Sequence, residues 1–213
     1  MNKIGVGLLA YNSEPWIRNS AGCLQPYVDK LCVKVDNKTT DRTREILDEM
    51  SIPHSDFQWT HNYADAKNLL VKELEGCDWM IFLDDDEMYS DDGGKALVEF
   101  VRSIDNPNIH GLEIPMKQKY PSWNTEPEDY MKEFGFNPHL SVFKKGYQFV
   151  NKIHESVAVP EENRIKFQFF VDRNIFIYHH AWKGNREKYE APKHFYYKDL
   201  SEGKTFQDGE HLW

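Results

Sequence analysis

The sequence predicts an α/β protein with a mostly parallel sheet flanked by helices and a smaller mixed β region in its C-terminal half. Two observations predict this class. Through roughly the first hundred residues, apolar runs of strand length alternate with segments whose apolar residues recur at helical spacing. The later half breaks this alternation and carries several short β-like runs in succession. A strict alternation of strands and helices is typical of parallel sheets whose faces are covered by helices.

The first half of the chain is predicted to contain four strands separated by three helices. The strands are expected at residues 3–10 (KIGVGLLA), 30–36 (KLCVKVD), 55–60 (SDFQWT) and 78–84 (DWMIFLD). The helices are expected between them, at about 13–24, 37–50 and 63–76. Ser13 can cap the first helix, and Thr39, Thr40 or Asp41 can cap the second, because short polar side chains accept hydrogen bonds from the first turn.

The second half is predicted to begin with a helix at 92–104 and a strand at 111–117. Residues 118–138 are rich in proline, aromatic and acidic residues, which suits a mobile lid over a site. Short β-like runs follow at 139–145 (HLSVFKK), 147–150 (YQFV), 154–159 (HESVAV), 166–171 (KFQFFV) and 175–180 (IFIYHH). A basic, aromatic helix is expected at 185–200.

Composition and charge limit the function classes. The chain has 213 residues, 40% of them hydrophobic, which suits one domain with a packed core. Lys plus Arg total 26 against 35 for Asp plus Glu, and this formal charge of −9 disfavours a broad nucleic-acid surface. The three cysteines lack metal-type spacing, and no apolar run reaches the ~20 residues of a membrane span. We therefore expect a soluble cytoplasmic protein with reduced thiols.

Polar side chains follow three of the predicted strands at the point where each strand ends. Asn12 follows the first strand, Asp36 ends the second, and Asp84 to Glu87 follow the fourth. If the strands are parallel, these residues share one edge of the sheet. Ligands of open α/β sheets bind beyond the carboxyl ends of the strands. The sequence therefore predicts a ligand site at this edge.

The acidic run Asp84-Asp85-Asp86-Glu87 is the strongest candidate for chemistry. Asp84 and Asp86 are two residues apart on an extended chain, so their side chains point to the same side. Mg²⁺ and Mn²⁺ prefer oxygen ligands, often one or two carboxylates completed by substrate phosphates. The alternative is an acidic surface turn, which the preceding buried-type strand WMIFL disfavours because it fixes the carboxylates at a sheet edge.

Other candidates have ordinary alternatives. Asp36 can accept hydrogen bonds from a base or a ribose, or it can serve a turn. Lys67 can reach a phosphate, or it can be a solvated surface lysine. His154 and His179 can add a nitrogen ligand to a metal, and Glu155 can act as a general base. His154, His179 and Glu155 can each equally be part of an ordinary β segment.

Four segments together resemble the family-2 glycosyltransferases, which have the GT-A fold. They are LLAYNSE (8–14), VKVDNKTTDRT (33–43), YADAKNLL (63–70) and WMIFLDDDE (79–87), which contains an Asp-x-Asp signature. The later segments 138–156 and 177–189 resemble small bacterial and phage-type members. The second segment departs from the usual pattern at Asn37-Lys38-Thr39. A late Glu-Asp pair that often marks the base is not evident.

The resemblance implies a metal-dependent inverting transferase that moves a sugar from a nucleotide-sugar donor, expected to be a UDP-sugar, to an unidentified acceptor. It implies one GT-A-like domain over 1–213, with a nucleotide-binding half at 1–105 and an acceptor-binding half at 106–213. Glu155 would be the base, and Asp86 would act in catalysis as a ligand of Mn²⁺ or Mg²⁺ with His179 and His154. The residues implied for the donor nucleotide are Ala10, Tyr11, Asn12, Glu14, Asp36, Lys67, Asn68, Asp84 and Asp85.

Two other classes stay open. A nucleotidyltransferase also uses a parallel sheet and an acidic metal site, but it usually has a glycine-rich basic loop after the first strand, and LLAYNSE has none. A non-catalytic nucleotide- or glycan-binding module would keep the fold without turnover. The acceptor can be a glycan, a protein or peptide, or a nucleic acid, the last being disfavoured by the charge. The sequence does not predict the oligomeric state.

Overall fold

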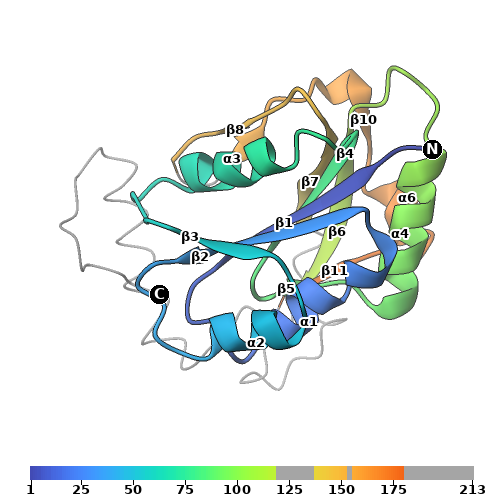
Figure 1. Cartoon of the computed structure of the whole chain (residues 1–213). Helices are drawn as coiled ribbons and strands as arrows, with labels where there is room; N and C mark the ends of the chain where they lie inside the picture. Colours follow the sequence, from blue (N-terminus) through green and yellow to red (C-terminus); the bar gives the residue numbers. More distant parts are fainter. Residues whose placement is uncertain (119–136, 153–154, 180–213) are drawn as a thin grey trace.

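The structure is a computed structural model of the chain, and it describes residues 1–118, 137–152 and 155–179 (Figure 1). Most of the predicted lid at 118–138 lies outside the described residues. The predicted helix at 185–200 and the candidate ligand His154 also lie outside them.

Nine strands of the described residues form one sheet in the order β3-β2-β1-β4-β7-β6-β11-β5, with β10 paired to β6. Their bounds are β1 Ile4–Ala10, β2 Lys30–Asp36, β3 His54–Phe57, β4 Trp79–Asp84, β5 Glu87–Met88, β6 Gly111–Gln118, β7 Asn137–Lys144, β10 Arg164–Ile165 and β11 Ile177–His179. The short strands β8 (Phe149–Val150) and β9 (Ser156–Val157) form a separate antiparallel pair.

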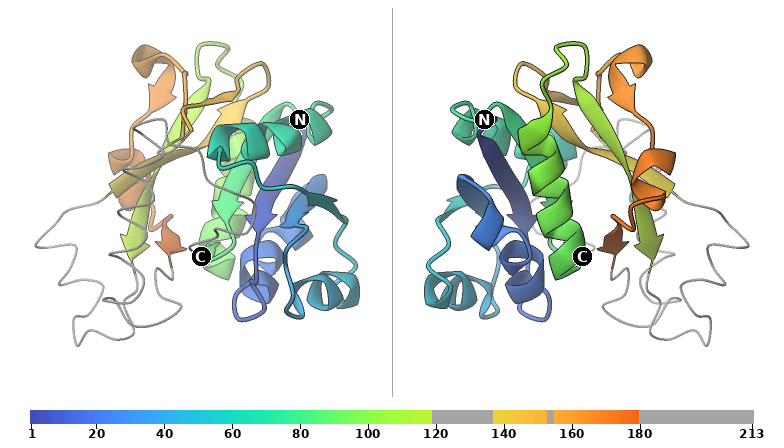
Figure 2. Two further views of the ribbon diagram at one scale, coloured as in Figure 1. Left: turned by 90° about the vertical axis from the view of Figure 1, so that its left-hand side faces the viewer. Right: turned by 90° about the vertical axis from the view of Figure 1, so that its right-hand side faces the viewer.

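Helices cover both faces of the sheet, as the alternation of elements predicted. They are α1 Ile17–Gly22, α2 Thr43–Glu49, α3 Tyr63–Glu73, α4 Asp91–Ser103 and α6 Gln168–Val171, with 3₁₀ turns at Gln25–Tyr27 and Glu161–Asn163. One core lies between the sheet and α1, α2, α4 and α6. A second core lies between the opposite face and α3 with the β8–β9 pair. Figure 1 shows α3 and β8 on the side of the sheet away from α1 and α2, and Figure 2 turns this arrangement by 90°.

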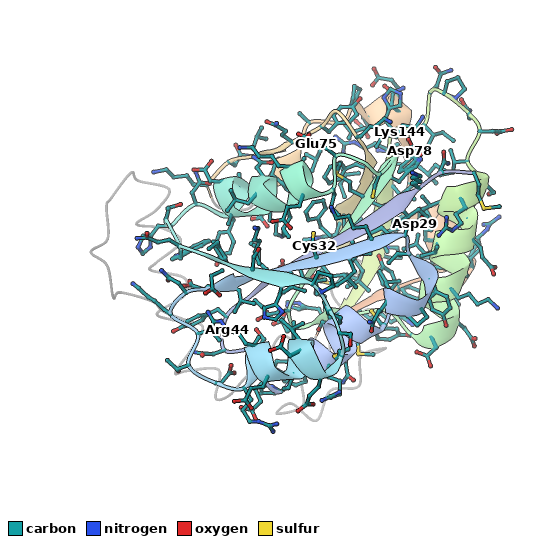
Figure 3. All side chains as sticks on the ribbon, viewed as in Figure 1. Asp29, Cys32, Arg44, Glu75, Asp78 and Lys144 are labelled. Atoms are coloured by element: carbon teal, nitrogen blue, oxygen red, sulfur yellow. The ribbon has the colours of Figure 1, made fainter. Side chains whose placement is uncertain are left out.

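The strands that precede the acidic run are parallel. β1 pairs with β2 and with β4 in parallel, and β2 pairs with β3 in parallel. The prediction that their carboxyl ends share one edge is therefore confirmed. In Figure 3, Asp29 and Asp78 lie at the amino ends of β2 and β4, whereas Arg44 lies near the opposite edge. The antiparallel strand β7 pairs with both β4 and β6, which joins the two halves of the chain in one sheet.

Strand β1 packs closely under α3 because two of the residues on the face toward this helix are glycines. Ile4, Val6 and Leu8 are fully buried on the face toward α1, whereas Gly5 and Gly7 face α3. A Cβ atom on Gly5 would lie 2.7 Å from a methyl carbon of Leu74. This close approach sets the distance between α3 and the sheet, and thereby the position of the polar residues on α3.

One predicted element is wrong. The run KFQFFV at 166–171, expected to be a strand, contains the short helix α6. Phe170 is fully buried, and Phe169 packs against Phe100 of α4 with ring centroids 4.9 Å apart. A short apolar run does not reveal its period, because a strand and a buried helical turn both need apolar residues.

In the described residues, every helix is too short or too polar to cross a membrane.

Candidate active site

The loops at the carboxyl edge of β1 and β2 are tied together by the side chains of Asn12 and Asp41. Asn12 has a positive φ of 47°, and its Oδ1 accepts a hydrogen bond from the Thr40 N–H at 2.9 Å. Asp41 accepts one from the Glu14 N–H at 2.9 Å. Two residues predicted to bind the donor, Asn12 and Glu14, therefore lie beside the loop that follows Asp36, and their contacts fix the two loops relative to each other.

Asp36, Tyr11 and Ala10 lie together where β1 and β2 end. Asp36 is 2% exposed, and its Oδ1 accepts a hydrogen bond from the Lys38 N–H at 2.9 Å. Burial raises the pKa of the Tyr11 hydroxyl, and the negative charge of Asp36 raises it further, which places the two side chains near each other. Ala10 is buried at the end of β1. The structure brings these predicted donor residues to one place.

Asp85 differs from its acidic neighbours because its carboxylate faces the β1–α1 loop. It accepts a hydrogen bond from the hydroxyl of Ser13, which is fully buried, and a longer one of 3.4 Å from the Tyr11 N–H. The Ser20 hydroxyl donates to the Asp85 carbonyl at 2.6 Å. The side chain of Ser13, expected to cap α1, instead joins that loop to the acidic turn. Asp85 holds these two segments together in this structure, and a contact of Asp85 with the donor stays a prediction.

The other three carboxylates of the acidic run have three different neighbours. Asp84 lies 2.8 Å from Nζ of Lys67, and Asp86 lies 3.4 Å from Nε2 of His179. Glu87 is 3% exposed and accepts a hydrogen bond from the Asp84 N–H at 3.0 Å, which closes the turn. Burial and the nearby charge of Asp84 raise the pKa of Glu87 to about 8. Glu87 pairs with His179 across the antiparallel strands β5 and β11, which explains why the imidazole reaches Asp86.

Lys67 lies between two carboxylates from distant parts of the chain. Its Nζ is 2.8 Å from Asp84 and 2.6 Å from Glu155, and its side chain is 7% exposed. Burial alone would lower the pKa of Lys67, but the two carboxylates outweigh burial and raise it. The pKa of Asp84 is lowered, because the charge and hydrogen bond of Lys67 outweigh the effect of burial. The structure therefore brings the predicted base Glu155 next to the predicted donor residue Asp84.

Asn68 uses both polar atoms of its side chain on the protein backbone. Its Nδ2 donates to the Phe149 carbonyl at 3.0 Å, and its Oδ1 accepts from the Phe149 N–H at 2.9 Å. Asn68 therefore fastens β8 to α3. A contact between Asn68 and the donor nucleotide remains a prediction.

His139 is a site residue that the sequence did not single out. It lies on β7, which pairs with β4 and thus brings it close to the carboxyl edge. Burial lowers the pKa of His139, and the nearby positive charge of Lys67 lowers it further, whereas Asp84 and Glu155 raise it. An imidazole with a lowered pKa therefore lies beside Lys67, Asp84 and Glu155. No spacing in the sequence marks it, because its closeness depends on β7 lying beside β4.

The candidate metal ligands fit a hard cation in part. In the described residues, no group of three His, Cys, Asp or Glu side chains is already arranged around one point. The Asp86 carboxylate and Nε2 of His179 nevertheless face each other at 3.4 Å. Two neighbouring ligands about 2.1 Å from one octahedral ion lie about 3.0 Å apart, which is close to this separation. Asp86 and His179 could thus hold a cation together, with Asp84 nearby.

A surface hollow at the opposite edge of the sheet is unrelated to these residues. It has a volume of about 460 Å³ and is lined by residues that include Asp29, Cys32 and His54. Asp29 and Cys32 are labelled in Figure 3, at the amino end of β2 and within that strand. None of the predicted site residues lines this hollow. The carboxyl edge, with its carboxylates, imidazoles and buried lysine, is therefore the candidate active site.

His179 should make the stability of the metal-free protein depend on pH. Burial lowers the pKa of His179, but Asp86, Glu87 and Asp84 outweigh burial and raise it from 6.5 to about 9. The folded state then binds the proton more tightly than the unfolded state, so this stabilisation is complete below about pH 6.5 and is lost as the pH rises through about 9. In EDTA, we expect the unfolding free energy from denaturant titrations to fall across this window. His179→Gln should reduce the slope, and an unchanged slope would contradict the assignment.

Comparison with known proteins identifies the family of the chain. A sequence model of the family described as Glycosyl transferase family 2 matches residues 6–189. The chain is 21% identical over 182 residues to the SPbeta prophage-derived glycosyltransferase SunS of Bacillus subtilis (strain 168), and to glycosyltransferase SunS of Bacillus phage SPbeta. These matches cover 84% of this chain but only 40% of each relative, so the chain spans two fifths of their length.

Among solved structures, the fold is similar to residues 1–349 of S. aureus TarS in complex with UDP, with a TM-score of 0.53 and 16% identity. That likeness covers 84% of this chain and 58% of the TarS chain. It supports the predicted GT-A-like α/β fold. Because the family model matches most of the sequence, the chain belongs to glycosyl transferase family 2.

Proposed function

We propose that this protein is a metal-dependent inverting glycosyltransferase that moves a sugar from a UDP-sugar to an acceptor. One observation carries the proposal: Asp84 and Asp86 lie at the carboxyl end of β4, at the same sheet edge as the buried Asp36, and Lys67 joins Asp84 to Glu155. The family match and the likeness to TarS, which was solved with UDP, support it.

The residues on the β1–β2 side suit the donor nucleotide. Asp36 and the loop of Tyr11 and Asn12 lie together and offer a carboxylate and an aromatic ring for the ribose and the base. Asp86 and His179, with Asp84, would hold Mn²⁺ or Mg²⁺. When bound, that cation offsets negative charge on the departing diphosphate.

Glu155 suits the role of general base on the acceptor side. In the proposed reaction Glu155 takes the proton of the attacking acceptor atom, which forms a bond to the anomeric carbon. The bond from that carbon to the diphosphate oxygen breaks, and the nucleoside diphosphate leaves with the electron pair. Attack from the face opposite the leaving group inverts the anomeric centre. A positioned base contributes about 10²–10⁴-fold to such a step.

The test is to incubate the protein with a panel of UDP-sugars and to measure UDP release with Mn²⁺, with Mg²⁺ and with EDTA. We expect UDP release that depends on the divalent ion, and a thermal shift with UDP that is larger when the ion is present, because a ligand that binds the folded state raises its stability. Binding without release would indicate a non-catalytic module. Pyrophosphate release from a nucleoside triphosphate and a sugar phosphate would indicate a nucleotidyltransferase. Either result would overturn the proposal.

A further inference from the structure

Helix α3 holds the segment that carries Glu155 through three separate contacts. The side chain of Asn68 makes its two hydrogen bonds with the backbone of Phe149, at the start of this segment. The Tyr63 N–H, in the first turn of α3, donates to the Lys152 carbonyl at 2.9 Å. Lys67 then contacts Glu155 itself at 2.6 Å. Glu155 is therefore fixed against α3 by the backbone before it and by its own carboxylate.

The ammonium group of Lys67 is paired with two carboxylates of the protein and is almost fully buried. Two carboxylates, Asp84 and Glu155, lie within hydrogen-bond distance of its Nζ, and the ring of Phe149 lies 5.5 Å from it. An ammonium group has only three protons to donate. The side chain is 7% exposed, against 13% for Glu155 and 43% for Asp84. The two carboxylates take two of the three protons, and little of the Lys67 side chain is left exposed to a donor phosphate, whereas much of the Asp84 side chain still faces solvent.

We propose that Lys67 is a positioning residue that holds the base Glu155 beside the end of β4, and that it does not bind the donor phosphates. The proposal rests on the glycosyltransferase function proposed above. It explains why a lysine is buried at this place. The ammonium group of Lys67 joins Asp84, the carboxylate proposed to meet the donor, to Glu155, the carboxylate proposed to receive the acceptor proton. The distance between donor and base is then set by the protein before any substrate binds.

The two possible roles of Lys67 predict opposite changes in Lys67→Met. If Lys67 positions Glu155, UDP affinity measured calorimetrically with Mn²⁺ should stay within about threefold, and turnover should fall by about 10²-fold, because only part of the contribution of a base is lost. If Lys67 binds a phosphate, UDP affinity should fall by tenfold or more, because a charge-assisted hydrogen bond to the ligand is lost. Lys67→Arg should restore part of the turnover by keeping the cation. Lys72→Met, an exposed lysine on the same helix, is the matched control and should change neither quantity.

A double-mutant cycle with Glu155→Gln tests the contact itself. If Lys67 acts through Glu155, Lys67→Met should lower turnover little further in a Glu155→Gln background, and the two effects on unfolding free energy should be non-additive. Additive effects on turnover and on unfolding free energy, or a tenfold loss of UDP affinity in Lys67→Met, would overturn the proposal. If Lys67→Met does not fold, Lys67→Gln, which also removes the charge, carries the same comparison.

The failure of the proposed function gives a different result. If the wild-type protein releases UDP from no UDP-sugar, the proposed reaction and the catalytic role of Lys67 are both overturned. The coupling between Lys67 and Glu155 in unfolding free energy would then still appear, because it depends on the folded protein alone.

Discussion

Asp86→Asn is expected to remove metal-dependent UDP binding and to lower UDP-sugar turnover by about 10³-fold or more. A bound cation stabilises the departing diphosphate by several kcal/mol, and each 1.4 kcal/mol is a factor of ten in rate. Asp86 is the carboxylate that lies 3.4 Å from His179, the other proposed ligand, and its side chain is 19% exposed. The measurements are UDP affinity by calorimetry with and without Mn²⁺, and steady-state UDP release.

Two further carboxylates make this experiment specific. Asp48→Asn changes an exposed acid of α2 and should leave UDP affinity and turnover unchanged. Asp85→Asn should lower the melting temperature, because its carboxylate contacts Ser13 and the Tyr11 N–H. It should leave the Mn²⁺ dependence of UDP binding in place. If Asp86→Asn binds UDP with unchanged Mn²⁺ dependence, or if Asp85→Asn alone abolishes that dependence, the metal role assigned to Asp86 is wrong.

Gly5→Val is expected to lower the unfolding free energy by about 3 kcal/mol, since added atoms in a packed core force side chains or backbone to move. A Cβ on Gly5 would lie 2.7 Å from Leu74 Cδ2 and 2.8 Å from Cys77 Sγ, and the valine methyl groups add to this overlap. For a chain of 213 residues this corresponds to a fall of roughly 10 °C in melting temperature. The measurement is denaturant titration together with a thermal melt.

Gly76→Ala is the matched control, because a Cβ there meets no atom within 4 Å. It should change the unfolding free energy by less than about 0.5 kcal/mol. A Gly5→Val protein as stable as this control would mean that α3 can move away from β1 without cost. In that case α3 would not hold Lys67 at a fixed place, and a loss of activity in the variant would be expected even with normal stability.

The elements that the sequence predicted well are those with a clear hydrophobic pattern. The strands at 3–10, 30–36 and 78–84 match β1, β2 and β4 to within one residue, since buried parallel strands need unbroken apolar runs. Their parallel pairing then places Asp36 and Asp84 at one edge, which is why the strand pattern alone could predict that these two carboxylates share an edge. The prediction failed at 166–171, where four aromatic or aliphatic side chains fit a helical turn as well as a strand.

The contacts within the site could not be predicted, because they depend on segments that are far apart in the sequence. Lys67 meets Glu155 only because the β8–β9 pair returns to α3, and His139 comes close only because β7 lies beside β4. The roles of Asp84, Asp85 and Asp86 also depend on geometry that residue type does not reveal. Three identical carboxylates in succession face a lysine, a serine and a histidine.

The pairing of β5 with β11 has a consequence for how the protein acquires its site during synthesis. A nascent chain that has left the ribosome only as far as β7 already contains β1, β2 and β4, but the strand that pairs with Glu87–Met88 among the described residues, Ile177–His179, has not yet emerged. A strand that pairs with the end of the acidic turn is therefore translated late, and it carries His179, a ligand of the proposed cation site. Ribosome-bound chains halted before Ile177 should fold most of the sheet and still fail to retain Mn²⁺.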